Sequence, residues 1–425
     1  MPGQVSTATP VASSTVSLHV ALAFAAILFV VLFWRLGAPS FWDPDEAHYA
    51  ETTRELVETG DWLAPYYNER PFFDKPILFH WLQGIPMALV GPPGAGHSNG
   101  HNELAARIVP ALAALALVGV TAWLGAVLFS ADVALIAALL LATNPALFAL
   151  ARYGILDTVF TLFLVAGAAL VSVSALQRRP RLQWPGYVAI ALAVLVKGPL
   201  ALVLCGLTFG LTLLLSAEAR ARLLELRLFR GILVVLVIAA PWFIYMGFRF
   251  GEAFINGYLL DENIRLYAAD RFTPTASSSV WFYFRVLAAG LLPWTGIVVG
   301  RLWDDVRAAV RRDGSLDPVD VLLWSWTIAI LAFFTFSKFK LDHYVFPTAP
   351  TLCLLCARAW VAVRERPDDP RHAGSRIGLS LVGPLLLVVA VAGAFMLIAR
   401  LALPPAALVV PAAVGIAGLA MTMSV

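Results

Sequence analysis

Charged residues are scarce in this sequence. Asp, Glu, Lys and Arg make up 13% of its 425 residues and 60% of the residues are hydrophobic, whereas a soluble domain averages about 25% charged residues. A mean hydropathy of +0.81 therefore excludes an ordinary soluble protein. The net charge of only +3, with basic residues in small scattered groups, disfavours nucleic-acid binding. Three cysteines are too few for a disulfide framework.

Long apolar runs are abundant instead. A membrane-spanning helix needs about 20 apolar residues, and twelve runs are candidates for such helices. They cover residues 16–34, 104–129, 132–150, 156–176, 185–196, 199–216, 231–250, 280–300, 319–336, 344–363, 377–399 and 405–423. The sequence therefore predicts an all-α integral membrane protein with about 12 transmembrane helices, in which residues 1–15 are disordered and residues 16–425 form one polytopic domain.

The stretch 185–216 needs a separate argument. It is too long for one span and short for two, and Lys197-Gly198-Pro199 interrupts it. Proline starts a helix better than it continues one, which favours two short helices. Arginine-rich segments flank the stretch on both sides, and such segments lie on the cytoplasmic side of a membrane. We therefore predict a hairpin with Lys197 near its outer tip.

The distribution of arginine also predicts the orientation. Four connecting segments hold three or four arginines each: 177–184, 217–230, 301–318 and 364–376. Because positive residues concentrate on the cytoplasmic side, these segments are predicted to lie inside and the long segments 35–103 and 251–279 outside. No internal repeat stands out, so an inverted-repeat transporter gains no support.

The large first outer loop, residues 35–103, carries more acids than bases. The patterns of 46–59 and 76–90 predict amphipathic helices that lie in the membrane interface. Gly60 is a typical residue to end the first of them. The stretch between them, 61–75, is dense in Trp, Tyr, Pro and Phe, which predicts an ordered cap instead of a flexible linker.

Three acids occur within four residues at Asp43-Pro44-Asp45-Glu46. Such close carboxylates repel one another, so they need a cation or a divalent metal nearby, or some of them stay protonated. The alternative is structural: Asp45 caps the helix predicted over 46–59, and its acids complement the helix dipole. The residues alone leave both interpretations open.

Further charged residues fall at the outer ends of predicted spans. Asp157 opens the fourth span, where an ionisable residue usually has a function, although it could also cap its helix. The cations predicted at the same face are Lys75, Arg265, Arg271, Lys338 and Lys340. An enzyme that uses a lipid phosphate needs cations at this depth. A solvated charged surface is the alternative for Lys338 and Lys340.

These motifs resemble a known family. The blocks in the first loop are Phe41-Trp42-Asp43-Pro44-Asp45-Glu46-Ala47-His48-Tyr49-Ala50-Glu51, Gly60-Asp61-Trp62, Pro65 and Phe73-Asp74-Lys75-Pro76. They resemble the first outer loop of the aminoarabinose transferases, which belong to the glycosyltransferase C superfamily with the protein O-mannosyltransferases as relatives. Later landmarks follow in order: Arg152…Asp157, Lys197-Gly198-Pro199, Pro241-Trp242, Glu262-Asn263…Arg265 and Ser337-Lys338-Phe339-Lys340-Leu341…Pro347.

The resemblance implies an integral enzyme of the bacterial inner membrane with its active site on the periplasmic face. Such enzymes take a sugar from a polyprenyl-phosphate carrier and transfer it, with inversion, to lipid A, another glycan or a protein hydroxyl. The implied partners are that donor, a lipid, glycan or protein acceptor, and membrane lipids, but no nucleic acid. Most aminoarabinose transferases have a further span and a soluble outer domain, both of which this sequence is expected to lack.

The resemblance also implies roles for residues. Asp45 matches the essential acid, which acts as a base or orients the acceptor, and Glu46 and Asp157 are predicted catalytic acids. Lys75 matches the lysine on the donor phosphate, with Arg265 or Arg271 as its helper. Further substrate contacts are predicted at Asp43, His48, Tyr49, Asp74, Lys338 and Lys340.

Two departures from the family pattern concern the expected site. Asp74 stands where many members have Glu, and Asn263 stands where some have His. A metal site built on that His is therefore in doubt, and no cofactor is certain. The alternative function is a transporter or flippase of lipid-linked sugars. It predicts ionisable residues near the middle of the membrane, whereas here they cluster at one predicted face.

Overall fold

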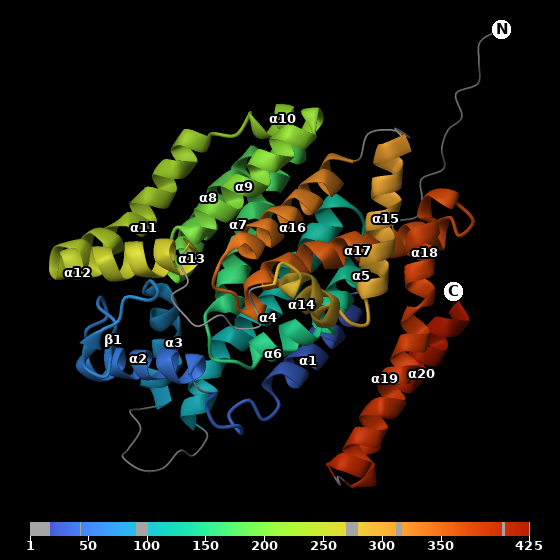
Figure 1. Cartoon of the computed structure of the whole chain (residues 1–425), viewed down its shortest axis with the longest axis horizontal. Coiled ribbons are helices and arrows are strands. Elements are labelled where there is room, and N and C mark those ends of the chain that lie inside the picture. The colour runs from blue at the N-terminus through green and yellow to red at the C-terminus, as the bar shows by residue number, and fades with distance from the viewer. Residues whose placement is uncertain are drawn as a thin grey trace.

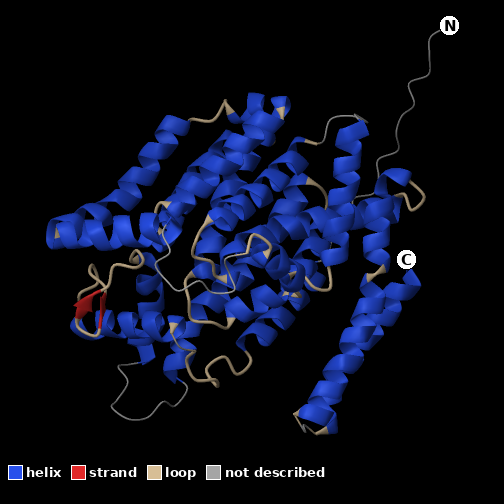
Figure 2. Cartoon of the chain, in the orientation of Figure 1, coloured by secondary structure: helices blue, strands red, loops and turns tan. Residues whose placement is uncertain are grey.

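The computed structural model describes residues 18–42, 44–90, 101–268, 279–311, 317–401 and 404–424. This described chain is almost entirely helical, with one short two-stranded hairpin (Figure 2). Two predicted site residues, Asp43 and Arg271, lie outside the described residues, as does the N-terminal segment predicted to be disordered.

Each of the twelve apolar runs is helical in the described part of the chain. The helices that cover them are α1 (Leu18–Phe33), α4 (His101–Leu128), α5 (Ala131–Ala142), α6 (Pro145–Ala151), α7 (Asp157–Leu176), α8 (Gln183–Lys197), α9 (Leu200–Leu215), α11 (Leu228–Phe250), α14 (Phe282–Gly290), α15 (Thr295–Arg311), α16 (Pro318–Phe336), η4 (Asp342–Thr348), α17 (Ala349–Glu365), α18 (Ala373–Ser380), α19 (Val382–Phe395), η6 (Met396–Arg400), η7 (Pro405–Leu408) and α20 (Val409–Ser424). Short helices at the connections are η1 (Pro180–Leu182), α10 (Ala217–Leu223) and η5 (Pro370–His372).

The number of membrane crossings is smaller by a strict criterion. Seven of the described helices are long and apolar enough to cross a membrane, or up to nine if two bent pairs count as one span each. The pairs are α5 with α6, bent by 62°, and α14 with α15, bent by 118°. Helices α1 and α9 are apolar but shorter. The structure therefore shows a polytopic helical membrane protein, while twelve crossings stays a prediction.

Helices α7 and α17 form the centre of the bundle, and α4, α5, α8 and α16 pack around them. Of the most apolar stretch of each, 72% is buried for α7 and 83% for η4 with α17. By contrast, only 11% is buried in the stretch that includes α19 and in the stretch of α20. Helices α19 and α20 form a hairpin at the side of the bundle (Figure 1). A bilayer can cover these apolar surfaces in place of protein.

The segment predicted as the first outer loop folds into α2 (Asp45–Thr59), the strands β1 (Tyr66–Tyr67) and β2 (Arg70–Pro71), and α3 (Leu78–Val90), which lie together at one end of the molecule (Figure 1). Gly60 ends α2 in the left-handed conformation, with φ of 71°, as predicted. The loop after it is ordered. Trp242 of α11 donates from Nε1 to the carbonyl of Leu63 at 2.9 Å, and Arg249 pairs with Asp61 at 2.7 Å.

The segment predicted as the second outer loop continues α11 as α12 (Glu252–Phe254), the wide π-helix η2 (Ile255–Arg265) and α13 (Leu266–Ala268). This segment packs against the turn between α8 and α9, where Gly198 has a φ of +81°. A Cβ atom at Gly198 would lie 2.0 Å from the Tyr258 hydroxyl, so only glycine fits. The predicted hairpin is thus confirmed, with Lys197 at its tip, and η2 is held against that tip.

Candidate functional site

Glu46 anchors the start of α2 to α4. Its buried carboxylate accepts hydrogen bonds from Arg107 Nε at 2.6 Å and Nη2 at 2.8 Å, and from the backbone amides of Gly154 at 2.7 Å and Trp42 at 2.9 Å. The remaining donors of Arg107 bind the carbonyls of Leu36, Pro39 and Ser40. Because both groups are saturated, this pair holds the chain between α1 and α2 in one geometry.

Asp45, by contrast, has a half-buried side chain. It is the first residue of α2, Pro44 stands at the N-cap, and no side chain caps the helix. The capping alternative for Asp45 is therefore wrong, although its charge still complements the dipole of α2. Within the described residues, its carboxylate forms no hydrogen bond or ion pair with another side chain. Asp45 thus differs from its neighbour Glu46, whose carboxylate is saturated by donors.

Tyr49 lies one turn along α2, near three of the predicted acids. Its pKa is raised well above the ordinary value, first by burial and then by the negative charges of Asp157, Asp74 and Asp45. These three acids come from α7, from the loop before α3 and from α2. The structure therefore brings together acids that are far apart in the sequence, around one tyrosine.

Asp157 forms a buried cluster with two basic side chains. One of its oxygens pairs with Lys197, and the other lies 3.6 Å from His343 Nε2. The Lys197 ammonium also lies over the ring of Tyr344, 4.7 Å from its centroid. No side chain caps α7, so the capping alternative for Asp157 is wrong as well. Asp157 instead fixes the cation at the tip of the α8–α9 hairpin.

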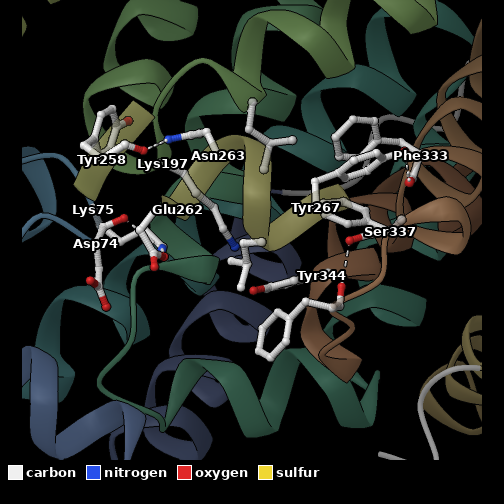
Figure 3. Close-up of a pocket in the computed structure, with 14 residues that line it drawn as sticks. Asp74, Lys75, Lys197, Tyr258, Glu262, Asn263, Tyr267, Phe333, Ser337 and Tyr344 are labelled. Atoms are coloured by element: carbon white, nitrogen blue, oxygen red, sulfur yellow. Dashed lines mark hydrogen bonds and ion pairs between the residues drawn. The ribbon is translucent and has the colours of Figure 1, made fainter. Parts of the chain in front are cut away.

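A cavity of about 80 Å³ opens beside this cluster (Figure 3). Lys75 projects from its wall, donating from Nζ to the carbonyl of Asp74 at 2.9 Å and lying 3.3 Å from Glu262 Oε2. The wall is otherwise formed by Lys197, Leu200, Tyr258, Asn263, Leu266, Tyr267, Phe333, Phe334, Ser337, Phe339 and Tyr344. Two lysines, Lys75 and Lys197, thus line one small cavity together with two acids, Asp74 and Glu262.

A second cavity of about 420 Å³ lies between α6, α14 and η4. Its walls are mostly apolar, and its polar residues are Asn144, Asp342 and His343. The buried Asn144 accepts from the Leu147 amide at 3.0 Å, whereas its Nδ2 has no partner in the described structure. Because His343 lines this cavity and Lys197 lines the first, the Asp157 cluster connects the two.

Other predicted site residues lie elsewhere. Arg265 is 60% exposed and pairs with Asp261 at 2.7 Å, so it does not line the small cavity. Lys338 is exposed, while Lys340 is buried and donates to the carbonyl of Ser337. His48 packs its ring edge-on to a tyrosine of β1. The predicted roles of these four residues as ligand contacts stay predictions.

The sequence interpretation assigned no role to several residues of this site. Lys197 was placed at an outer tip, and an ionisable residue at the edge of an apolar run is itself a signal of function. Arg107, a lone arginine inside a long apolar run, gave the same signal. Glu262 stood only among the family landmarks and His343 gave no signal, because their partners, Lys75 and Asp157, are distant in the sequence.

Metal binding finds no support in the described residues, which contain no group of three or more His, Cys, Asp or Glu side chains placed to hold an ion. Asn263 donates from Nδ2 to the carbonyl of Tyr258 at 2.7 Å, so it stabilises the π-helix. The arrangement as a whole is suited to binding a phosphate beside acids that can act on a second group.

Several known proteins are similar to this chain. The crystal structure of ArnT from Cupriavidus metallidurans bound to undecaprenyl phosphate has a TM-score of 0.71 and 27% identity, over 96% of this chain and 71% of that chain. The undecaprenyl phosphate-alpha-4-amino-4-deoxy-L-arabinose arabinosyl transferase of Pectobacterium carotovorum is 31% identical over 80% of this chain. An Archaeoglobus fulgidus oligosaccharyltransferase, 14% identical with a TM-score of 0.54, shares the fold.

The fold and the site define a membrane-embedded, aminoarabinose-transferase-like member of the glycosyltransferase C superfamily. The family described as dolichyl-phosphate-mannose-protein mannosyltransferase matches residues 22–253, more than half of the sequence, and the chain belongs to it. The chain spans about 60% of the length of the Pectobacterium relative and 64% of that of a Proteus mirabilis relative, to which it is 28% identical.

Proposed function

We propose that this protein is a glycosyltransferase that moves a sugar from a polyprenyl-phosphate donor to an acceptor at the periplasmic face of the bacterial inner membrane. The observation that carries the proposal is the small cavity lined by Lys75 and Lys197, next to the acids around Tyr49. A relative of similar fold binds undecaprenyl phosphate. The arginine distribution supports an outward-facing site.

Lys75 binds the donor phosphate in this proposal. As the glycosidic bond breaks, negative charge grows on the phosphate that leaves, so a fixed cation stabilises the transition state more than the ground state. Lys197 adds a second cation in the same cavity, and Asp157 holds it in place. Arg265 or Arg271 stays the predicted arginine helper of Lys75 beside this lysine pair.

Asp45 acts on the acceptor. If the acceptor attacks through a hydroxyl, the half-buried Asp45 carboxylate accepts its proton as a general base. If the acceptor is a phosphate anion, it needs no base and Asp45 orients it instead. Glu46 is proposed to position Asp45, because its clamp to Arg107 fixes the first turn of α2.

The acceptor, a lipid, glycan or protein, approaches through the second cavity. Inversion requires attack on the anomeric carbon from the side opposite the phosphate, and this cavity lies across the Asp157 cluster from Lys75. Its apolar walls favour an acceptor with an apolar portion. The alternative, a transporter or flippase of lipid-linked sugars, is less well supported because the charged residues of the candidate site gather at one end of the bundle.

Sugar transfer by the purified protein in lipid nanodiscs tests the proposal. Undecaprenyl phosphate-linked aminoarabinose serves as donor, membrane lipids and glycans as acceptors, and mass spectrometry detects the product. Lys75→Ala should weaken product inhibition by undecaprenyl phosphate at least about tenfold, because the cation is lost, and should slow turnover. Lys75→Arg should recover more of the binding than of the rate. Unchanged inhibition in Lys75→Ala would remove Lys75 from the donor site.

A further inference from the structure

The ion pair between Lys75 and Glu262 is looser than the Glu46–Arg107 and Asp157–Lys197 pairs. Its 3.3 Å separation exceeds the about 2.7–2.9 Å of a strong charge-assisted hydrogen bond, whereas Glu46 lies 2.6 Å from Arg107. The two side chains are 17% and 15% exposed, against 2% and 0% for Arg107 and Glu46. A partly hydrated pair of this kind costs little to separate.

Glu262 reaches Lys75 from a different part of the chain. It lies on the π-helix η2, and Tyr258 and Asn263 of the same helix also line the cavity (Figure 3). Such wide helical turns occur frequently at functional sites. The pair therefore joins the second outer loop to the first across the cavity, and its separation would leave the backbone of either loop intact.

A phosphate and Glu262 compete for the same ammonium. Lys75 has three N–H donors and already gives one to the carbonyl of Asp74. Two anions held against one cation in a cavity of about 80 Å³ repel each other. The repulsion is larger for the released carrier phosphate than for the donor, because a phosphomonoester carries about −1.5 to −2 charges and a diester only one.

We propose that Glu262 is a displaceable counter-ion of Lys75. It neutralises Lys75 in the empty site, yields that cation to the donor phosphate, and competes for it again after transfer, which hastens release of the carrier. The inference rests on the proposed function, since it assumes that Lys75 binds the phosphate. Its consequence is that Glu262 weakens phosphate binding, the reverse of what a ligand-binding residue does.

Binding of undecaprenyl phosphate to the protein in nanodiscs tests this role. Glu262→Gln should bind undecaprenyl phosphate about five- to tenfold more tightly, in line with removing a competing, partly exposed partner, and should lower kcat by slowing release. Glu262→Asp keeps the charge and should stay near wild type. Asp261→Asn is the matched control on the same helix, since Asp261 pairs with Arg265 outside the cavity, and its affinity should not change.

The outcomes separate the inference from the function it rests on. Weaker or unchanged binding in Glu262→Gln, with the thermal midpoint of the wild type, would show that Glu262 merely holds Lys75 in place and would overturn the counter-ion role. Tightening in both Glu262→Gln and Asp261→Asn would indicate a general charge effect and would also overturn it. A wild-type protein that binds no undecaprenyl phosphate would instead refute the proposed function, and this inference with it.

Discussion

The two ends of the helical bundle treat buried charge differently. At the end where α16 begins, Arg301 binds Asp305 and Asp320 at 2.7 Å each, and Asp304 accepts from the amides of Gly374 and Ser375 at 2.8 Å. Around the cavity at the other end, the Lys75–Glu262 pair is longer, at 3.3 Å, and partly exposed, although the neighbouring Lys197–Asp157 pair is buried. Saturated networks hold helices together, whereas charges left available beside a cavity can act on a ligand.

The Gly–Gly crossing of α15 and α18 explains why the first network is so tight. A Cβ atom at Gly300 would lie 2.1 Å from the carbonyl oxygen of Gly374, so the two backbones can touch only because both residues are glycine. The close approach lets backbone amides of α18 reach Asp304. Glu46 and Arg107 lie near the cavity, but their hydrogen bonds are saturated as well. This pair therefore belongs with the structural networks.

The largest expected effect is a loss of stability when Arg301 is removed from the saturated network. Arg301→Leu leaves Asp305 buried without its cation and Asp320 with Arg358 alone, which should lower the free energy of unfolding by about 3–5 kcal/mol. Thermal unfolding in detergent measures the change. Arg311→Leu, at an exposed position of the same helix, should cost only about 0.5 kcal/mol. Sugar transfer per folded molecule should remain near wild type, and a selective loss of transfer would contradict the structural assignment.

Replacing Asp45 is expected to reduce sugar transfer and to leave stability unchanged. Asp45→Asn keeps the size of the side chain but removes its charge, and transfer should fall by at least about a hundredfold, as for loss of a general base. The thermal midpoint should not move, because Asp45 has no partner among the described residues to lose. Glu58→Gln, on the exposed end of the same helix, is the control for charge alone. Retained transfer in Asp45→Asn would place Asp45 outside the chemistry.

The smallest effect concerns a buried histidine behind the site. Burial lowers the pKa of His80 to about 3, below the ordinary value of about 6.5. Between these values the unfolded chain binds a proton that the folded protein does not, so stability falls as the pH falls. The loss should reach about 2 kcal/mol at pH 5.

Thermal unfolding at pH 7.5 and pH 5 measures this loss. His80→Asn should lack that part of the acid destabilisation, although it weakens the 2.8 Å contact with Thr53. His19→Asn, at an exposed position of α1, should keep the loss seen in wild type. Equal pH dependence in His80→Asn and wild type would show that groups other than His80 govern the loss of stability in acid.

Much of the architecture follows from local sequence. The apolar runs fixed the helices, because a membrane demands long stretches whose backbone groups pair internally. Pro199 and Gly198 gave the hairpin at 185–216, and Gly60 gave the end of α2. These features depend on residues close together in the chain. The strict number of crossings does not follow so directly, since α5–α6 and α14–α15 are sharply bent.

The sequence by itself determined the class of protein, the twelve helical runs and the acids and lysines worth testing, because hydropathy, helix-breaking residues and motif spacing are local properties. Only the tertiary structure decided which charges meet. It paired Glu46 with Arg107 and thereby separated it from its neighbour Asp45, and it set Glu262 against Lys75 across 187 residues. The physical reason is that a carboxylate's role depends on which donors surround it, and those donors come from helices that only packing brings together.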